Sequence, residues 1–326
     1  MLAIHNEFTA TLLSSGKVLA AGGRLSSTSI ATCEIHDPST GQWNSTASMA
    51  TARAAHTATL LSTGKVLVTG GIGSGGIPSN DLASCEIFDP STGQWKSTGS
   101  MAAARSSHTA TLLSTGKVLV TGGLQFLTAL TSCEIFDPST GQWKSTASMA
   151  IARAAHTATL LSSGKVLVTG GIDLASCEIF DPSTDQWNST ASMATVRFDH
   201  TATLFSSGKV LVTGGGLIST SVATCEIFDP STDQWNSTAS MATARAYHTA
   251  TLFSSDKVLV TGGAQSSTSV ATCEIFDPST GQWNSTASMA TARYHHTATL
   301  FSSGQVLAAG GQSQSTELAS CEIYTP

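Results

Sequence analysis

The residues of this sequence that could do chemistry recur at fixed places in a tandem pattern. Arginine stands three residues before histidine in six copies, at Arg53, Arg105, Arg153, Arg197, Arg245 and Arg293. A Cys-Glu-Ile triplet recurs seven times, beginning at Cys33, Cys85, Cys133, Cys177, Cys225, Cys273 and Cys321. Residues that recur in this way serve the fold of every repeat. A site that is particular to this protein is therefore expected where the repeats differ.

The cysteines and histidines of the pattern predict structural roles. One cysteine per repeat and an odd total argue against a disulfide framework. The Cys-x-x-Cys spacing of zinc sites is absent, and zinc needs ligands that converge to about 2.0–2.1 Å from the ion. Equivalent residues of successive repeats lie too far apart for that. We expect buried, reduced thiols, histidines that hydrogen-bond between neighbouring repeats, and neither a metal nor a cofactor.

The repeated arginine and glutamate leave two interpretations open. A buried charge survives only when it is paired, so the first is an Arg–Glu ion pair inside each repeat. The second is a set of guanidinium groups that face an anionic ligand, such as an acidic peptide.

Four short strands per repeat must position these residues. In the second repeat we expect strands at 56–61, 65–69 and 84–88, and a fourth that begins at Trp95. Asp89-Pro90-Ser91-Thr92-Gly93 between the last two has the residues that β-turns prefer. No stretch shows a sustained 3.6-residue period, so helix is expected to be nearly absent.

The pattern as a whole resembles the kelch repeat. It has a Gly pair after an apolar strand, then Glu-x-aromatic-Asp-Pro, then Trp, then Met-x-x-x-Arg-x-x-His, from about Thr9 to Pro326. The resemblance implies an all-β fold, a seven-bladed β-propeller of four-stranded antiparallel blades. Because Met1 aligns with Met49 and Pro326 with Pro90, we expect a three-stranded last blade; a piece of a longer array is the alternative. We expect one domain, 1–326, with repeats at about 8–48, 49–100, 101–148, 149–192, 193–240, 241–288 and 289–326.

Composition excludes several classes of function. The net charge is −6, only 11% of residues are charged, and no basic stripe exists to neutralise phosphates, so nucleic acid is excluded as a partner. No apolar run approaches the roughly 18 residues of a membrane span. Free cysteines and the lack of a secretion signal favour the cytoplasm. Asn-Ser-Thr sequons favour an extracellular location instead, at Asn44, Asn188, Asn236 and Asn284.

Catalysis is not expected. Copper radical oxidases similar to galactose oxidase share a kelch-like propeller, and that resemblance implies two tyrosines, a Tyr–Cys crosslink and two histidines at the metal. The chain has only Tyr247, Tyr294 and Tyr324, and all its cysteines belong to the repeat. We therefore expect no catalytic residue, with a remnant of such an enzyme as the least favoured alternative.

The candidate site lies where the repeats diverge, in the loop after the Gly pair and in the two residues before the first strand. That pair is Ala or Ser in repeats two to four. In repeats five to seven it becomes Phe198-Asp199, Ala246-Tyr247 and Tyr294-His295. Aromatic residues near arginine are typical of binding sites. We therefore predict a ligand-binding rim made of Phe198, Asp199, Tyr247, Tyr294 and His295, together with Arg197, Arg245 and Arg293.

The sequence thus predicts a monomeric, non-catalytic scaffold. It would bind a protein, an acidic peptide or a carbohydrate at one rim of the propeller. The alternative is an extracellular carbohydrate-binding propeller or a structural one at the cell surface.

Overall fold

The computed structural model describes residues 1–3, 5–75, 80–217 and 220–326, and the regular structure in these ranges is all β. None of these residues belongs to a helix that could cross a membrane. The contacts divide the chain into two compact parts. The first half comprises residues 1–154 and 317–321, and the second half comprises residues 155–316 and 322–326.

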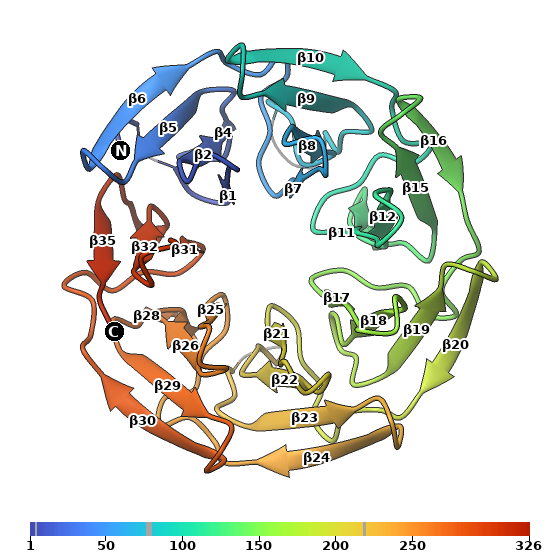
Figure 1. Cartoon of the computed structure of the whole chain (residues 1–326), viewed down its shortest axis with the longest axis vertical. Helices are drawn as coiled ribbons and strands as arrows, with labels where there is room; N and C mark the ends of the chain where they lie inside the picture. Colours follow the sequence, from blue (N-terminus) through green and yellow to red (C-terminus); the bar gives the residue numbers. More distant parts are fainter. Residues whose placement is uncertain (4, 76–79, 218–219) are drawn as a thin grey trace. The chain divides into compact units, whose positions relative to one another are not determined.

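The first half contains three blades, and each is an antiparallel sheet of four strands (Figure 1). In blade one the strands follow the order β1 (Thr9–Leu12), β2 (Val18–Ala21), β5 (Cys33–Asp37) and β6 (Gln42–Thr46). Blade two has β7 (Thr57–Leu60), β8 (Val66–Thr69), β9 (Cys85–Asp89) and β10 (Gln94–Thr98). Blade three has β11 (Thr109–Leu112), β12 (Val118–Thr121), β15 (Cys133–Asp137) and β16 (Gln142–Ser145).

The second half contains the other four blades. Blade four has β17 (Thr157–Leu160), β18 (Val166–Thr169), β19 (Cys177–Asp181) and β20 (Gln186–Thr190). Blade five has β21 (Thr201–Leu204), β22 (Val210–Thr213), β23 (Cys225–Asp229) and β24 (Gln234–Thr238). Blade six has β25 (Thr249–Leu252), β26 (Val258–Thr261), β29 (Cys273–Asp277) and β30 (Gln282–Thr286). Blade seven has three strands, β31 (Thr297–Leu300), β32 (Val306–Ala309) and β35 (Cys321–Tyr324). The fold class is thus confirmed: a seven-bladed β-propeller whose last blade has three strands.

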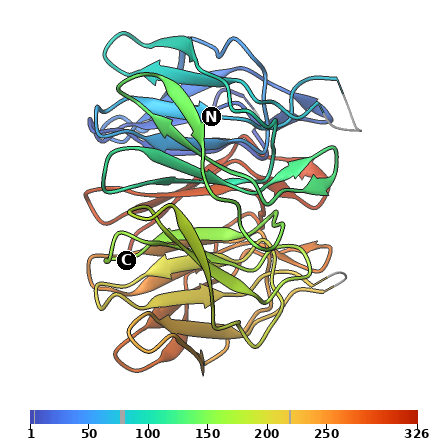
Figure 2. The same ribbon diagram turned by 90° about the vertical axis from the view of Figure 1, so that its right-hand side faces the viewer.

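Short hairpins follow the Gly pair in four blades, and Figure 2 shows the β13–β14 hairpin extending beyond its blade. They are β3–β4 (Arg24–Leu25, Thr28–Ser29), β13–β14 (Leu124–Gln125, Thr128–Ala129), β27–β28 (Ala264–Gln265, Thr268–Ser269) and β33–β34 (Gln312–Ser313, Thr316–Glu317).

The second strand of each blade is apolar on both faces because it lies between two neighbouring blades. In blade two, Val66 and Val68 pack with the core of blade one, and Leu67 packs with that of blade three. All three side chains are fully buried, and each contributes about 1.5–3 kcal/mol of hydrophobic stabilisation. Successive side chains of a strand point to opposite faces. Because both faces of this strand are buried, the middle of the run Lys-Val-Leu-Val-Thr before the Gly pair of repeats two to six is continuously apolar.

The repeated histidines link neighbouring blades, as the sequence predicted. His108 of blade three places its Nε2 atom 3.1 Å from the Thr57 hydroxyl and 3.0 Å from the Thr69 hydroxyl of blade two. In the second half, His200, His248 and His296 make the equivalent pair of contacts with the preceding blade.

The cysteines lie inside these cores. Six of the seven are buried, and Cys321 is half-buried because blade seven lacks the fourth strand that covers it elsewhere. The expectation of seven buried thiols is therefore correct for six of them.

Candidate functional site

The two residues between arginine and histidine lie beside the loop that follows the Gly pair of the same blade. The first of them forms an isolated β-bridge across this gap, from Phe198 to Gly216 and from Tyr294 to Gln312. The two variable regions therefore share one rim within each blade, as the sequence predicted.

The second of the two residues has a left-handed backbone in every repeat. In the second half its φ is 48° at Asp199, 55° at Tyr247 and 52° at His295. This conformation turns the N–H of each residue toward the preceding blade. Tyr247 donates to the carbonyl oxygen of Asp199 at 3.0 Å, and His295 donates to that of Tyr247 at 3.3 Å. A chain of hydrogen bonds thus runs along the rim from blade to blade.

Bulky residues in this conformation are unusual. A left-handed backbone costs a residue other than Gly about 1–2 kcal/mol, and blades two to four carry only Ala55, Ser107 and Ala155 at this position. Tyr247 and His295 occupy it nevertheless. The backbone conformation is common to all seven repeats, so Tyr247 and His295 differ from Ala55, Ser107 and Ala155 only in their side chains. Large aromatic side chains that the fold does not need make these two positions candidates for a ligand-binding role.

Tyr247, Tyr294 and His295 form one group, which we call the aromatic rim cluster. The ring centroids of Tyr247 and His295 are 4.3 Å apart, those of Tyr294 and His295 are 5.2 Å apart, and the two tyrosine rings are 6.2 Å apart. All three side chains are half-buried, and the Tyr294 hydroxyl donates to the carbonyl oxygen of Gln314 at 3.0 Å. The structure thus brings together three of the predicted binding residues from blades six and seven.

Phe198 packs within blade five. A Cβ atom added at Gly216 would meet its ring at 2.6 Å, so the ring covers a third glycine that follows the Gly pair of this blade alone. The half-buried Phe198 occupies in blade five the position that Tyr294 occupies in blade seven, and each forms the β-bridge to the loop after the Gly pair. The Phe198 ring does not contact the rings of the aromatic rim cluster. Asp199 joins the rim through its carbonyl oxygen.

The arginines require a correction. Arg197, Arg245 and Arg293 are fully buried, and their guanidinium groups point into their own blades. The Nη2 atom of Arg245 lies 2.7 Å from Glu274 Oε1, and Nη1 donates to the carbonyl oxygens of Gly262 and Thr272 at 2.7 and 2.8 Å. Since all the guanidinium groups are enclosed in this way, the prediction that they face a ligand is wrong, and the buried Arg–Glu pair is the correct interpretation.

The glutamates of these pairs also hold the backbone between blades. Glu274 accepts hydrogen bonds from the N–H groups of Ala242 and Thr243 at 2.7 and 3.2 Å. The first blade lacks the repeated arginine, and His5 takes its place. Its Nδ1 atom lies 2.6 Å from the Gly22 carbonyl oxygen, and Nε2 lies 3.4 Å from Glu34 Oε1. The alignment of Met1 with Met49, which puts His5 over Arg53, is the sequence signal for this substitution.

Burial keeps the repeated histidines and cysteines in their neutral forms. Burial, reinforced by the neighbouring arginine, lowers the pKa of His200 and that of His296 to about 3, so both imidazoles are neutral. Burial raises the pKa of the Cys225 thiol to about 11. Among the described residues, no group of three or more His, Cys, Asp and Glu side chains could hold a metal ion.

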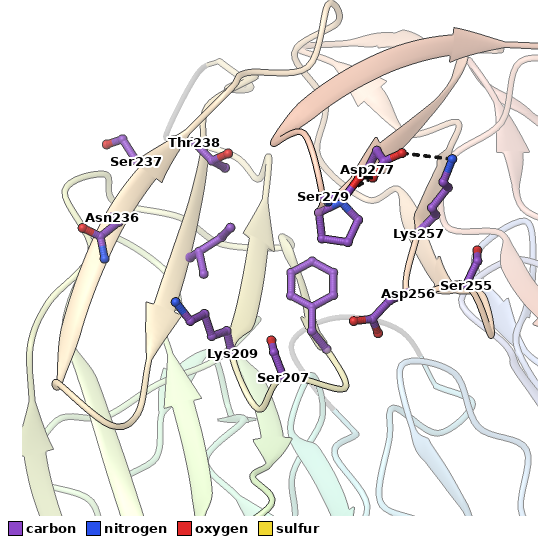
Figure 3. A pocket seen from close by; sticks show the side chains of 13 residues that line it. Ser207, Lys209, Asn236, Ser237, Thr238, Ser255, Asp256, Lys257, Asp277 and Ser279 are labelled. Atoms are coloured by element: carbon purple, nitrogen blue, oxygen red, sulfur yellow. Dashed lines mark hydrogen bonds and ion pairs between the residues drawn. The ribbon is translucent and has the colours of Figure 1, made fainter.

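A groove at the opposite ends of blades five and six was missed by the sequence reasoning (Figure 3). It has a volume of about 940 Å³, and Lys209 and Asn236 line it from blade five. From blade six, Lys257 lies 3.0 Å from Asp277, and Asp256 accepts hydrogen bonds from the N–H and hydroxyl of Ser206 at 2.9 and 2.7 Å. The sequence does mark this place as different from the other repeats, because Asp256 stands where the other six have Gly.

Comparison with known proteins gives a consistent result. The family model described as the KLHDC2/KLHL20/DRC7 Kelch-repeats domain matches residues 7–215, and the Kelch motif matches residues 198–242 and 245–290. No curated protein sequence matches the chain.

Two solved structures show the same fold at low identity. One is titled "Novel fungal alcohol oxidase with catalytic diversity among the AA5 family, in complex with copper"; the TM-score is 0.82 at 18% identity, over 99% of this chain and 74% of that chain. The other, "Structure of YjhT", has a TM-score of 0.69 at 15% identity, over 87% of this chain and 98% of that chain.

The residues of this chain do not fit the copper ligand set of a radical oxidase. His248 and His296 follow the rim positions in sequence, but each Nε2 atom lies 3.0–3.2 Å from two threonine hydroxyls of the preceding blade. The Sγ atom of Cys225 donates to the carbonyl oxygen of Ala223 inside the hydrophobic core, away from the tyrosines. The donors at the rim are therefore two phenols and one imidazole, without the second imidazole and the Tyr–Cys crosslink.

Proposed function

Because the chain belongs to the kelch-repeat propeller family, whose fold serves as a binding scaffold, we propose that it binds a ligand at the rim of blades five to seven without catalysing a reaction. The observation that carries the proposal is the aromatic rim cluster. Tyr247 and His295 occupy left-handed positions where three sister blades carry Ala or Ser, so the fold itself does not require their side chains.

The buried groups support a binding role over a catalytic one. The repeated histidines and arginines, and all but one of the cysteines, are committed to the cores and contacts between strands and blades. At the two positions before the first strand, blades five to seven differ from blades two to four in their aromatic side chains, which supply binding energy through stacking and burial.

A protein or peptide is the first candidate for the ligand, and a carbohydrate is the second. Sugars stack on tyrosine rings and hydrogen-bond to carboxylate, imidazole and phenol groups, all of which occur at this rim. An immobilised glycan array and an immobilised synthetic peptide array, both probed with the purified chain, separate the two classes of ligand.

The triple variant Phe198→Ala/Tyr247→Ala/Tyr294→Ala tests the site on both arrays. It is expected to fold, because blades two to four already carry Ala or Ser at these positions, and to lose the ligands that the natural chain binds. Phe126→Ala is the matched control, since Phe126 is an exposed aromatic on the rim of blade three. Unchanged binding by the triple variant, or no ligand for the natural chain on either array, contradicts the proposal.

A further inference from the structure

Every lysine and arginine in the second half of the chain has an acidic partner within its own blade. The second half contains three arginines and three lysines. The arginine pairs are Arg197–Glu226, Arg245–Glu274 and Arg293–Glu322, with N···O distances of 2.7–2.8 Å. The lysine pairs are Lys165–Asp181, Lys209–Asp229 and Lys257–Asp277, each at 3.0 Å.

None of the six cations is placed to meet a ligand at the aromatic rim cluster. The arginines are fully buried. The lysines directly precede the second strand of their blade, whereas the rim lies beyond the end of that strand. A strand of four residues is about 13 Å long, so a lysine ammonium group is separated from the rim by the length of the blade.

The rim carries carboxylates on blades four and five. Asp199 lies one blade before Tyr247 in the chain of rim hydrogen bonds, and its side chain is half-buried. Asp173 is exposed in the loop that follows the Gly pair of blade four. No lysine or arginine of the second half reaches this rim, so an anion bound beside the Asp199 carboxylate would have only the imidazole of His295 to replace its lost hydration.

We propose that the aromatic rim cluster binds a positively charged group, the guanidinium or ammonium of a basic peptide side chain. This proposal rests on the proposed function, and it replaces the acidic peptide that the sequence suggested. The faces of Tyr247 and Tyr294 carry the negative side of the ring quadrupole and attract a cation placed over them. Asp199 adds a carboxylate to the same rim.

Isothermal titration of the full chain with three acetylated and amidated peptides, Gly-Gly-X-Gly-Gly, tests the charge. X is Arg, Gln or Glu. The Arg peptide is expected to bind at least about tenfold more tightly than the other two. Tetramethylammonium chloride, titrated against matched sodium chloride, separates recognition of charge alone from recognition of a peptide.

Variants locate the binding. Tyr247→Ala/Tyr294→Ala is expected to weaken the binding of the Arg peptide by roughly 3- to 30-fold. Asp199→Asn, which keeps a residue tolerant of the left-handed backbone, should weaken it less, and Phe126→Ala should leave it unchanged.

Three outcomes overturn the inference. If the Gln or Glu peptide binds as well as the Arg peptide and Tyr247→Ala/Tyr294→Ala abolishes that binding, the rim is a binding site but the charge is wrong. If the Arg peptide binds the natural chain and this variant equally, both the inference and the proposed site are wrong. No binding of the Arg peptide or of tetramethylammonium up to about 10 mM, where binding free energy is under roughly 3 kcal/mol, also overturns the inference.

Discussion

Mild acid is expected to unfold this protein through its buried histidines. Burial lowers the pKa of His56, His200 and His296 to about 3, and holds that of His248 well below its ordinary range. An unfolded histidine has a pKa of about 6.5. The unfolded chain therefore binds protons that the folded chain does not bind. The contribution of these histidines to the free energy of unfolding is present above about pH 6.5 and is lost as the pH falls from 6.5 toward 3.

The size of the effect follows from the four histidines. At pH 5.5, one unit below the ordinary pKa, each histidine lowers the free energy of unfolding by about 1.4 kcal/mol. Four together lower it by about 5–6 kcal/mol, which approaches the whole stability of many folded proteins, about 5–15 kcal/mol. The turn aspartates do not contribute to the change in stability between pH 6.5 and 5.5. The pKa of Asp89, like those of its repeat equivalents, is lowered to about 2, so these carboxylates become protonated only in stronger acid.

Urea unfolding followed by tryptophan fluorescence at a series of pH values measures this slope. The number of protons taken up on unfolding is expected to rise from about two at pH 6.5 to nearly four at pH 5.5. His200→Phe, which copies the buried Phe8 of the first repeat, should reduce the uptake by about one proton. Thr157 and Thr169 keep each other as hydrogen-bond partners at 2.7 Å in that variant. A stability that does not change between pH 7.5 and 5.5 would refute the reasoning.

Three further predictions concern groups fixed between strands and blades. A thiol reagent should modify half-buried Cys321 first and the other six cysteines only on unfolding; rapid native labelling of several thiols would contradict the packing. Arg245→Met should lower the free energy of unfolding in urea by about 3–5 kcal/mol, because Glu274 is left buried and charged. Adding Glu274→Gln should recover part of this loss, and an equal loss in both variants would argue against the ion pair. Asp256→Gly should cost about 1 kcal/mol in the same assay, since the loss of two hydrogen bonds to Ser206 outweighs the relief of a left-handed backbone; a gain in stability would reverse that ranking.

Repetition made most of the fold predictable. Seven copies of one hydrophobic and turn pattern placed the strands of blade two to within one or two residues, with 57–60 observed for 56–61 expected. Histidine contacts between blades were also predictable, because a polar residue repeated in a core needs a repeated partner.

The direction of a long side chain was not predictable. The spacing of Arg245 and His248 puts both at the start of a strand, but it does not say whether the guanidinium turns toward Glu274 or toward solvent. The left-handed backbone at Tyr247 was equally hidden, because it is imposed by a hydrogen bond to the preceding blade rather than by a local Gly. The groove beside Asp256 depends on packing between two blades, which no single repeat encodes.

The chain of rim hydrogen bonds has a consequence for how such a protein arises. Tyr247 gives its N–H to the blade before it and its carbonyl oxygen to the blade after it, so a single residue carries both halves of the junction. A duplicated coding segment brings a donor and an acceptor together, and the new blade joins its neighbours without leaving either group unsatisfied. This hydrogen bond therefore sets no limit on the number of copies, and it makes no demand on the side chains by which the copies differ.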